Sequence, residues 1–144
     1  MYTILMKNDK SLSKTKVQTI YQGENLVDQL SFLIPLQYGD FMLSDFEAKL
    51  IYIDPCNYIH SEILNLSDND YKGMLQYRLP LDSKLTKYAG DIKFRLVFKN
   101  NEFVLRSGET SITITTSAPF IFNGQTDDSI EEITAEEIEA LFKK

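Results

Sequence analysis

Apolar and polar residues alternate most regularly in the stretch 90–116. Every second position from Ile92 to Phe98 is a large apolar residue, and most of the positions that flank them are charged. A period of two is typical of a β-strand with one buried face and one solvated face. The next four residues, 99–102, include two asparagines, which tolerate the left-handed backbone of a tight turn. The chain then returns through 103–105 and 111–115, so the pattern predicts a β-hairpin.

Shorter segments with a similar pattern occur along the rest of the chain. They predict strands over 2–6, 16–21, 26–35, 46–53, 58–64 and 71–79. Turn-forming residues separate these segments at short intervals, and no amphipathic helix lies between them. About eight strands in this arrangement predict an all-β fold, namely a two-layer antiparallel β-sandwich over residues 1–120.

The period changes in the acidic segment 121–144, where apolar residues recur every three to five positions. Thr134 and Glu137 are spaced as a capping box, so a short C-terminal α-helix is expected there. A helix of about 10 residues is marginal alone in water, and this one has to pack on its own sandwich, on a symmetry mate or on a neighbouring protein. The apolar residues expected to make this partner contact are Ile133, Ile138, Leu141 and Phe142.

Charge is distributed unevenly along the chain. Residues 127–144 contain seven acidic side chains and two lysines, a net charge of −5, whereas the whole 144-residue chain has −6. The remaining body is therefore close to neutral. Nucleic-acid binding needs clustered lysine and arginine, so we expect no nucleic-acid partner.

Composition restricts the cellular context. Cys56 is the one cysteine, so an intramolecular disulfide framework is excluded. The N-terminal stretch 1–9 has too short an apolar run for a signal peptide, and no segment approaches the ~18 apolar residues of a membrane span. We expect a protein without signal peptide or membrane contact, made in the cytoplasm.

The cysteine and the only histidine, His60, are four residues apart. This spacing would align them on a helix, but Pro55 and the surrounding strand pattern argue against one. A cysteine–histidine nucleophile also needs an orienting third group and an oxyanion site. We interpret the pair as a half-buried structural thiol beside a surface histidine.

Metal-binding and cofactor motifs are incomplete. Asp68, Asp70 and Gly73 partly match a calcium-binding loop, but Lys72 and Leu79 occupy positions that need oxygen ligands, which favours a solvated turn. Zinc would need a histidine and cysteine cluster, and phosphate a glycine-rich loop. We therefore expect no catalytic residue, no metal and no cofactor.

Tyrosines are numerous and leave an alternative open. They could line a sugar-binding groove, or they could be cross-strand packing partners, for which sheets favour them. These residues are Tyr21, Tyr38, Tyr52, Tyr58, Tyr71, Tyr77 and Tyr88.

Residues 1–116 resemble the N-terminal domain of phage and prophage baseplate upper proteins. The similar segments are 1–10 (MYTILMKNDK), 21–28 (YQGENLVD), 46–52 (FEAKLIY), 79–82 (LPLD), 89–98 (AGDIKFRLVF) and 107–114 (SGETSITI). The shared pattern is a short first strand, a strand entered after a glutamine- or glycine-bearing turn, and a closing hairpin that begins Ala-Gly. It contains no catalytic signature.

The resemblance implies a non-enzymatic structural protein of a phage tail, located in the virion and assembled in the bacterial cytoplasm. Its partners would be other tail and baseplate proteins. The family often trimerises through a coiled coil that follows this domain, so a homo-oligomer is implied, although 121–144 has too few heptads to form a coiled coil alone. The alternative function is a carbohydrate-binding sandwich or adhesin module that contacts the host surface.

Overall fold

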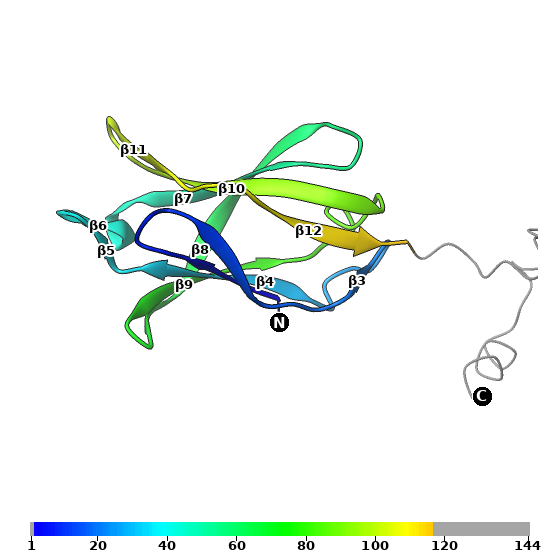
Figure 1. The fold of residues 1–144 in the computed structure, drawn as a ribbon, viewed down its shortest axis with the longest axis horizontal. Coiled ribbons are helices and arrows are strands. Elements are labelled where there is room, and N and C mark those ends of the chain that lie inside the picture. The colour runs from blue at the N-terminus through cyan, green and yellow to red at the C-terminus, as the bar shows by residue number, and fades with distance from the viewer. Residues whose placement is uncertain (1, 117–144) are drawn as a thin grey trace, which may run out of the picture.

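The computed structural model describes residues 2–116, which form twelve strands and one 3-10 turn (Figure 1). The strands are β1 (Tyr2–Met6), β2 (Leu12–Lys16), β3 (Ile20–Tyr21), β4 (Gln29–Pro35), β5 (Gln37–Tyr38), β6 (Phe41–Met42), β7 (Glu47–Ile53), β8 (Ile59–Tyr71), β9 (Met74–Pro80), β10 (Gly90–Asn100), β11 (Phe103–Arg106) and β12 (Thr110–Thr115). The 3-10 turn η1 spans Leu43–Asp45. The all-β class is therefore confirmed.

Ten of these strands belong to one mixed sheet. Its order is β2-β1-β4-β9-β8-β7-β10-β12-β3, with β11 paired to the far half of β10, and β5 and β6 form a separate two-stranded hairpin. Most neighbours are antiparallel, but β1 pairs with β4 and β12 pairs with β3 in parallel. The expected wholly antiparallel arrangement is wrong at these two places, because strands distant in the sequence enter the sheet from the same end.

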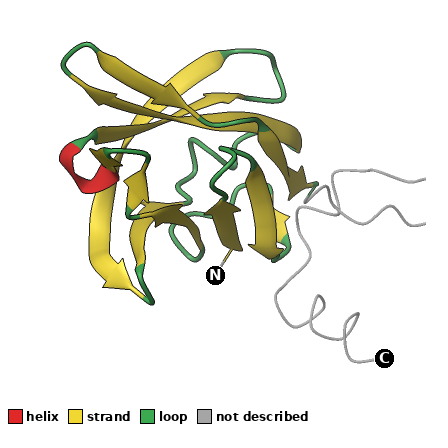
Figure 2. Ribbon diagram, turned by 60° about the vertical axis from the view of Figure 1, so that its left-hand side comes forward, coloured by secondary structure: helices red, strands yellow, loops and turns green. Residues whose placement is uncertain are grey.

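The long strand β8 connects the two halves of this sheet. Its first part, up to Leu64, pairs with β7, and its second part, from Asn65, pairs with β9. The register of β8 against β9 shifts twice, between Leu66 and Asp68 and between Asp68 and Tyr71, and such irregularities accompany strong local twist in a strand. The sheet consequently curls back, as Figure 2 shows. A two-layer sandwich of separate sheets is not confirmed.

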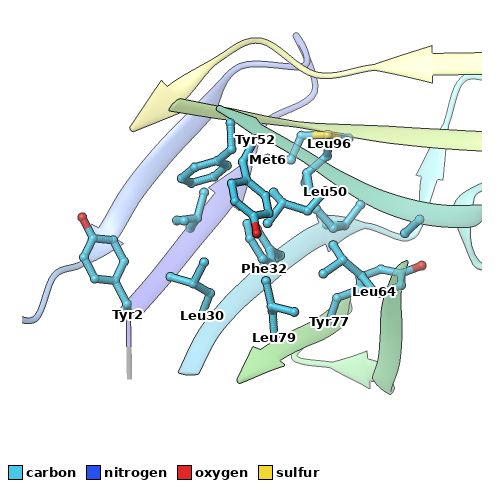
Figure 3. Packing of buried hydrophobic residues seen from close by; sticks show 14 of the residues in the cluster. Tyr2, Met6, Leu30, Phe32, Leu50, Tyr52, Leu64, Tyr77, Leu79 and Leu96 are labelled. Atoms are coloured by element: carbon cyan, nitrogen blue, oxygen red, sulfur yellow. The ribbon is translucent and has the colours of Figure 1, made fainter. Parts of the chain in front are cut away.

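Buried side chains from both halves meet inside the curled sheet (Figure 3). The ring of Phe32 on β4 packs edge-on against Phe94 on β10, with centroids 6.0 Å apart. Tyr77 on β9 contacts Phe98 on β10 in a similar way at 6.2 Å. The apolar face predicted for 92–98 is thus buried, and it forms one wall of the core.

Over the described residues, the structure has twelve strands where the sequence predicts about eight, because short and polar strands lack the alternating pattern. β2 lies in a stretch where the sequence predicts no strand until residue 16, and three of its five residues are exposed. It is an edge strand, held by pairing to β1, so it needs no alternating apolar pattern. The expected C-terminal helix lies outside the described residues.

Replacement of Phe32 by Ala should lower the free energy of unfolding by about 3–5 kcal/mol, because the side chain is fully buried and its removal leaves a cavity against Phe94. Denaturant titration measures the change. Val17→Ala, at an exposed position after β2, is the control and should stay within about 0.5 kcal/mol of the parent. Equal losses for both variants would contradict the packing described here.

Candidate docking surface

A groove of about 360 Å³ opens at one end of the molecule, between the β5–β6 hairpin and the β10–β11 hairpin. Figure 1 shows both hairpins at this end. Its lining residues are Lys10, Tyr38, Phe41, Phe46, Phe103, Val104, Leu105 and Arg106. Most of the lining residues are apolar or aromatic, and the two cations are Lys10 and Arg106.

Aromatic rings run through this groove from the core to the surface. Phe46 is buried, and its ring packs edge-on against Phe41 at 5.9 Å. Phe41 in turn contacts Phe103 on the opposite hairpin at 5.0 Å. Phe103 keeps 48% of its surface exposed and Phe41 keeps 39%. Exposed aromatic residues clustered in this way are typical of protein and ligand contacts.

Local hydrogen bonds hold the β5–β6 hairpin that supplies Phe41. Gly39 has a φ of 56° in the turn, where an L side chain is strained, and the Gln37 side chain donates to its carbonyl at 2.9 Å. After the hairpin, Leu43 is fully buried and its N–H donates to the carbonyl of Leu36. This buried leucine fixes the hairpin to the body, so the aromatic groove has a defined shape.

The groove is locally basic in a protein with a net charge of −6. The Lys10 ammonium lies 5.1 Å from the centre of the Tyr38 ring, a cation–π contact. Among the described residues, the lining holds Lys10 and Arg106 and no carboxylate. Gly108 also donates its N–H to the Lys10 carbonyl at 2.8 Å, which ties the β1–β2 turn to the segment after β11.

The structure gives His60 a partner that the sequence did not indicate. His60 Nε2 lies 2.8 Å from Asp54 Oδ2. The other carboxylate oxygen of Asp54 accepts from the backbone N–H groups of Cys56 and Tyr58, at 2.9 and 3.0 Å. The Cys56 thiol is exposed, so the expectation of a half-buried thiol is wrong. Asp54 thus closes the turn between β7 and β8.

Burial and hydrogen bonds have opposite effects on the pKa of the Asp54 carboxyl. Burial of Asp54 disfavours its charged form, but the His60 side chain and the two N–H groups of Tyr58 and Cys56 stabilise that form more strongly. The pKa of Asp54 is consequently held below its ordinary value of 3.8.

Tyr52 stacks on the His60 ring, with centroids 4.9 Å apart. Burial, together with the nearby charges of Glu62, Asp82 and Asp54, raises the pKa of Tyr52 to about 12. Its hydroxyl is buried and has no hydrogen-bond partner among the described residues. Tyr52 is therefore a neutral packing residue at physiological pH.

The segment that partly matches a calcium loop is a hairpin turn. Lys72 and Gly73 have φ values of 51° and 80°, the pattern of a two-residue turn between antiparallel strands. Asp68 Oδ1 accepts from the N–H of Asp70 at 3.0 Å. Over residues 2–116, no group of three or more acidic, histidine or cysteine side chains could hold a metal ion.

The tyrosines do not form one groove. Tyr52 and Tyr77 are buried in the core, whereas Tyr21 and Tyr58 are exposed at other places. Only Tyr38 among them lines the groove. The sequence did not indicate Phe41 and Phe103, because they come together from hairpins some sixty residues apart. The predicted contact residues Ile133, Ile138, Leu141 and Phe142 lie outside the described residues.

Within the described part of the chain, no helix combines the length and hydrophobicity that crossing a membrane requires.

Comparison with known proteins gives one kind of similarity. No protein-family model and no curated protein matches the chain. Among solved structures, the chain is similar to the N-terminal domain of phage TP901-1 ORF48, with a TM-score of 0.43 and 9% sequence identity over 81% of this chain and 98% of that chain. The matched domain belongs to a phage protein.

Asp54→Asn should make stability less dependent on acid pH. Because the folded-state pKa of Asp54 is depressed, its charge stabilises the fold above about pH 4 and this contribution disappears as pH falls through the folded-state value. The difference in free energy of unfolding between parent and variant should therefore be largest near neutral pH and shrink in acid. Cys56→Ser keeps the backbone N–H and should follow the parent at every pH. Parallel pH profiles for the parent and Asp54→Asn would contradict the assignment.

Proposed function

We propose that the chain is a non-enzymatic structural protein of a phage or prophage tail, which acts by docking to other tail and baseplate proteins. The observation that supports docking best is the exposed contact of Phe41 with Phe103 in a groove attached to the core. The resemblance of residues 1–116 to baseplate upper proteins supports the tail location. A virion tail component of this kind would assemble in the bacterial cytoplasm.

The chemistry of the groove suggests which partner it accepts. Aromatic side chains in a fixed pocket are the residues that contribute most energy to protein interfaces. The cations of Lys10 and Arg106 lie beside them without an acidic neighbour in the lining, among the described residues. We therefore infer an apolar partner segment that also carries carboxylates, contributed by a neighbouring tail protein.

The residues with catalytic potential support a structural role over an enzymatic one. A nucleophilic thiol needs a nearby base and a site for the developing negative charge. Here His60 is bonded to Asp54, and that same carboxylate closes the turn that contains Cys56. These hydrogen bonds give the side chains of His60 and Asp54, and the backbone N–H of Cys56, a role in forming the turn.

The acidic segment would provide a second contact. We propose that residues 121–144 form a separate element, joined to the domain of 1–120, in which a short helix packs on a partner or on another copy of the chain. A homo-oligomer such as the family's trimer is one such assembly. The capping box and the apolar spacing of Ile133, Ile138, Leu141 and Phe142 support this proposal.

Carbohydrate binding is the second candidate function, and the groove gives it one specific support. Tyr38, Phe41 and Phe103 are rings that could stack on sugar faces, with the Lys10 ammonium within reach of hydroxyl groups. In that case the domain alone would bind cell-wall polysaccharide on the host surface.

Phe103→Asp tests the groove. The change places a charge in the aromatic cluster, so it should weaken binding to neighbouring tail proteins by about 2 kcal/mol or more, roughly a thirtyfold loss of affinity. Purified chain is mixed with these proteins and the complexes are sized by light scattering. Val27→Asp, at an exposed apolar position in the loop before β4, is the control and should bind as the parent does.

Retention of full binding by Phe103→Asp would contradict docking through the groove. The same two variants are titrated with cell-wall polysaccharide. Saturable binding by the parent that Phe103→Asp removes and Val27→Asp keeps would favour the carbohydrate function instead.

The double substitution Ile138→Asp and Leu141→Asp tests the acidic segment. Charges on the expected apolar face should disrupt assembly while the β signal in circular dichroism stays unchanged, because the substitutions lie outside the described sheet. Sizing by light scattering measures assembly. Assembly equal to that of the parent would show that this segment makes no partner contact.

A further inference from the structure

The first half of β8 has an open edge. Residues 59–64 pair with β7 on one side, whereas β9 pairs with β8 only from Asn65 onward. Within residues 2–116, the other side of 59–64 has no neighbouring strand. An open edge offers unpaired N–H and C=O groups to another strand.

The direction of these backbone groups follows from the turn. The Tyr58 carbonyl accepts from the Asp54 N–H at 3.0 Å, so Tyr58 directs its polar groups toward β7. Successive residues of a strand alternate in direction. Ile59, Ser61 and Ile63 therefore direct their N–H and C=O groups toward the open edge, where none of them bonds to another described group.

This edge lacks the usual protection. Natural edge strands are blunted by proline, charged side chains, bulges or a covering loop. Segment 59–64 contains no proline, lysine or register shift, and its one carboxylate, Glu62, is paired with Lys84. Two isoleucines on its outer face are largely exposed, Ile59 at 73% and Ile63 at 59%. A long exposed edge with apolar side chains is the kind of site to which a further strand adds.

We propose that this edge of β8 pairs with the same edge of a second copy, antiparallel, with Ser61 opposite the partner's Ser61 across a two-fold axis. Ile59 then lies opposite the partner's Ile63, so both isoleucines of each copy gain an apolar neighbour. The outward-directed groups of 59, 61 and 63 form the hydrogen-bonded positions of the new ladder, as the alternation requires. The proposal does not depend on the groove or on the tail location.

Side chains on the inner face of β8 favour this register over its neighbours. With Ser61 at the axis, His60 lies opposite the partner's Glu62, and this pair occurs twice. A shift of two residues either way would place His60 against the partner's His60, or Glu62 against the partner's Glu62. Two carboxylates directly opposite destabilise a strand pair, and two imidazoles gain nothing from each other, whereas an imidazole and a carboxylate can hydrogen-bond across it.

The pairing leaves the groove accessible. The turn between β7 and β8 projects at the end of the molecule opposite to β6 and β11 (Figure 1). Lys84, from the segment between β9 and β10, contacts Glu62 on the inner face of β8, with its Nζ atom 3.2 Å from Glu62 Oε1. This contact partly neutralises the carboxylate that would face the partner's histidine. A paired molecule could therefore still dock through both of its grooves.

The test uses the full chain and two independent measurements. Ile59→Lys with Ile63→Lys should halve the particle mass in light scattering at high protein concentration. Ile53→Lys is the matched control, because Ile53 is exposed on the same face but belongs to β7, away from the open edge. It should keep the mass of the parent.

Ser61→Cys in a Cys56→Ser background provides the second measurement. Cα atoms of a hydrogen-bonded antiparallel pair are about 5.5 Å apart, which a disulfide can span. Mild oxidation should link two chains through residue 61, whereas Ser67→Cys in the same background, in the second half of β8, should stay unlinked. Linking at 61 alone supports the proposal even if the lysine variant does not fold.

Three outcomes would overturn the proposal. The first is a parent chain with no two-fold association at high concentration. The second is equal loss of mass for Ile53→Lys, which would indicate face-to-face contact of isoleucines. The third is absence of a disulfide at residue 61 in a chain that still associates.

Discussion

The change of partner along β8 is the constraint on which the rest of the structure depends. One strand of thirteen residues joins β7 through its first half and β9 through its second half. The two pairings are offset along β8, and the register shifts against β9 accompany a strong local twist, so the sheet curls and its two halves face each other. The core then fills with side chains from β4 and β9 on one side and β7 and β10 on the other.

The same constraint generates the two surfaces with potential for binding. The first half of β8, which pairs with β7 before β9 joins at Asn65, has an open edge on its other side. At the far end of the molecule, the curled sheet leaves room for the β5–β6 hairpin to approach β11, and Phe41 meets Phe103 there. Core side chains pack against one another, whereas these two regions expose apolar side chains to solvent.

The sequence predicted those elements whose stability comes from local pattern. The alternation from 92 to 98 identifies β10, and the two asparagines identify the turn that follows, where Asn101 has a φ of 55°. β2 has no such pattern because it is held by pairing to β1. The parallel pairs and the groove could not be predicted, since they bring together residues that are distant along the chain, such as Phe41 and Phe103. The expected contacts of Ile138 and its neighbours remain a prediction.

The parallel pairing of β3 with β12 has a consequence for how the polypeptide reaches its native state. Ile20 is buried, and its strand neighbour in the sheet is Ile114, ninety-four positions later in the chain. Pairings of such high sequence separation slow folding, since loop-closure entropy is lost before the contact forms. During synthesis, the strand at 20–21 has no partner until residue 114 has left the ribosome. The nascent chain therefore completes its sheet late, and one of its first strands is among the last to dock.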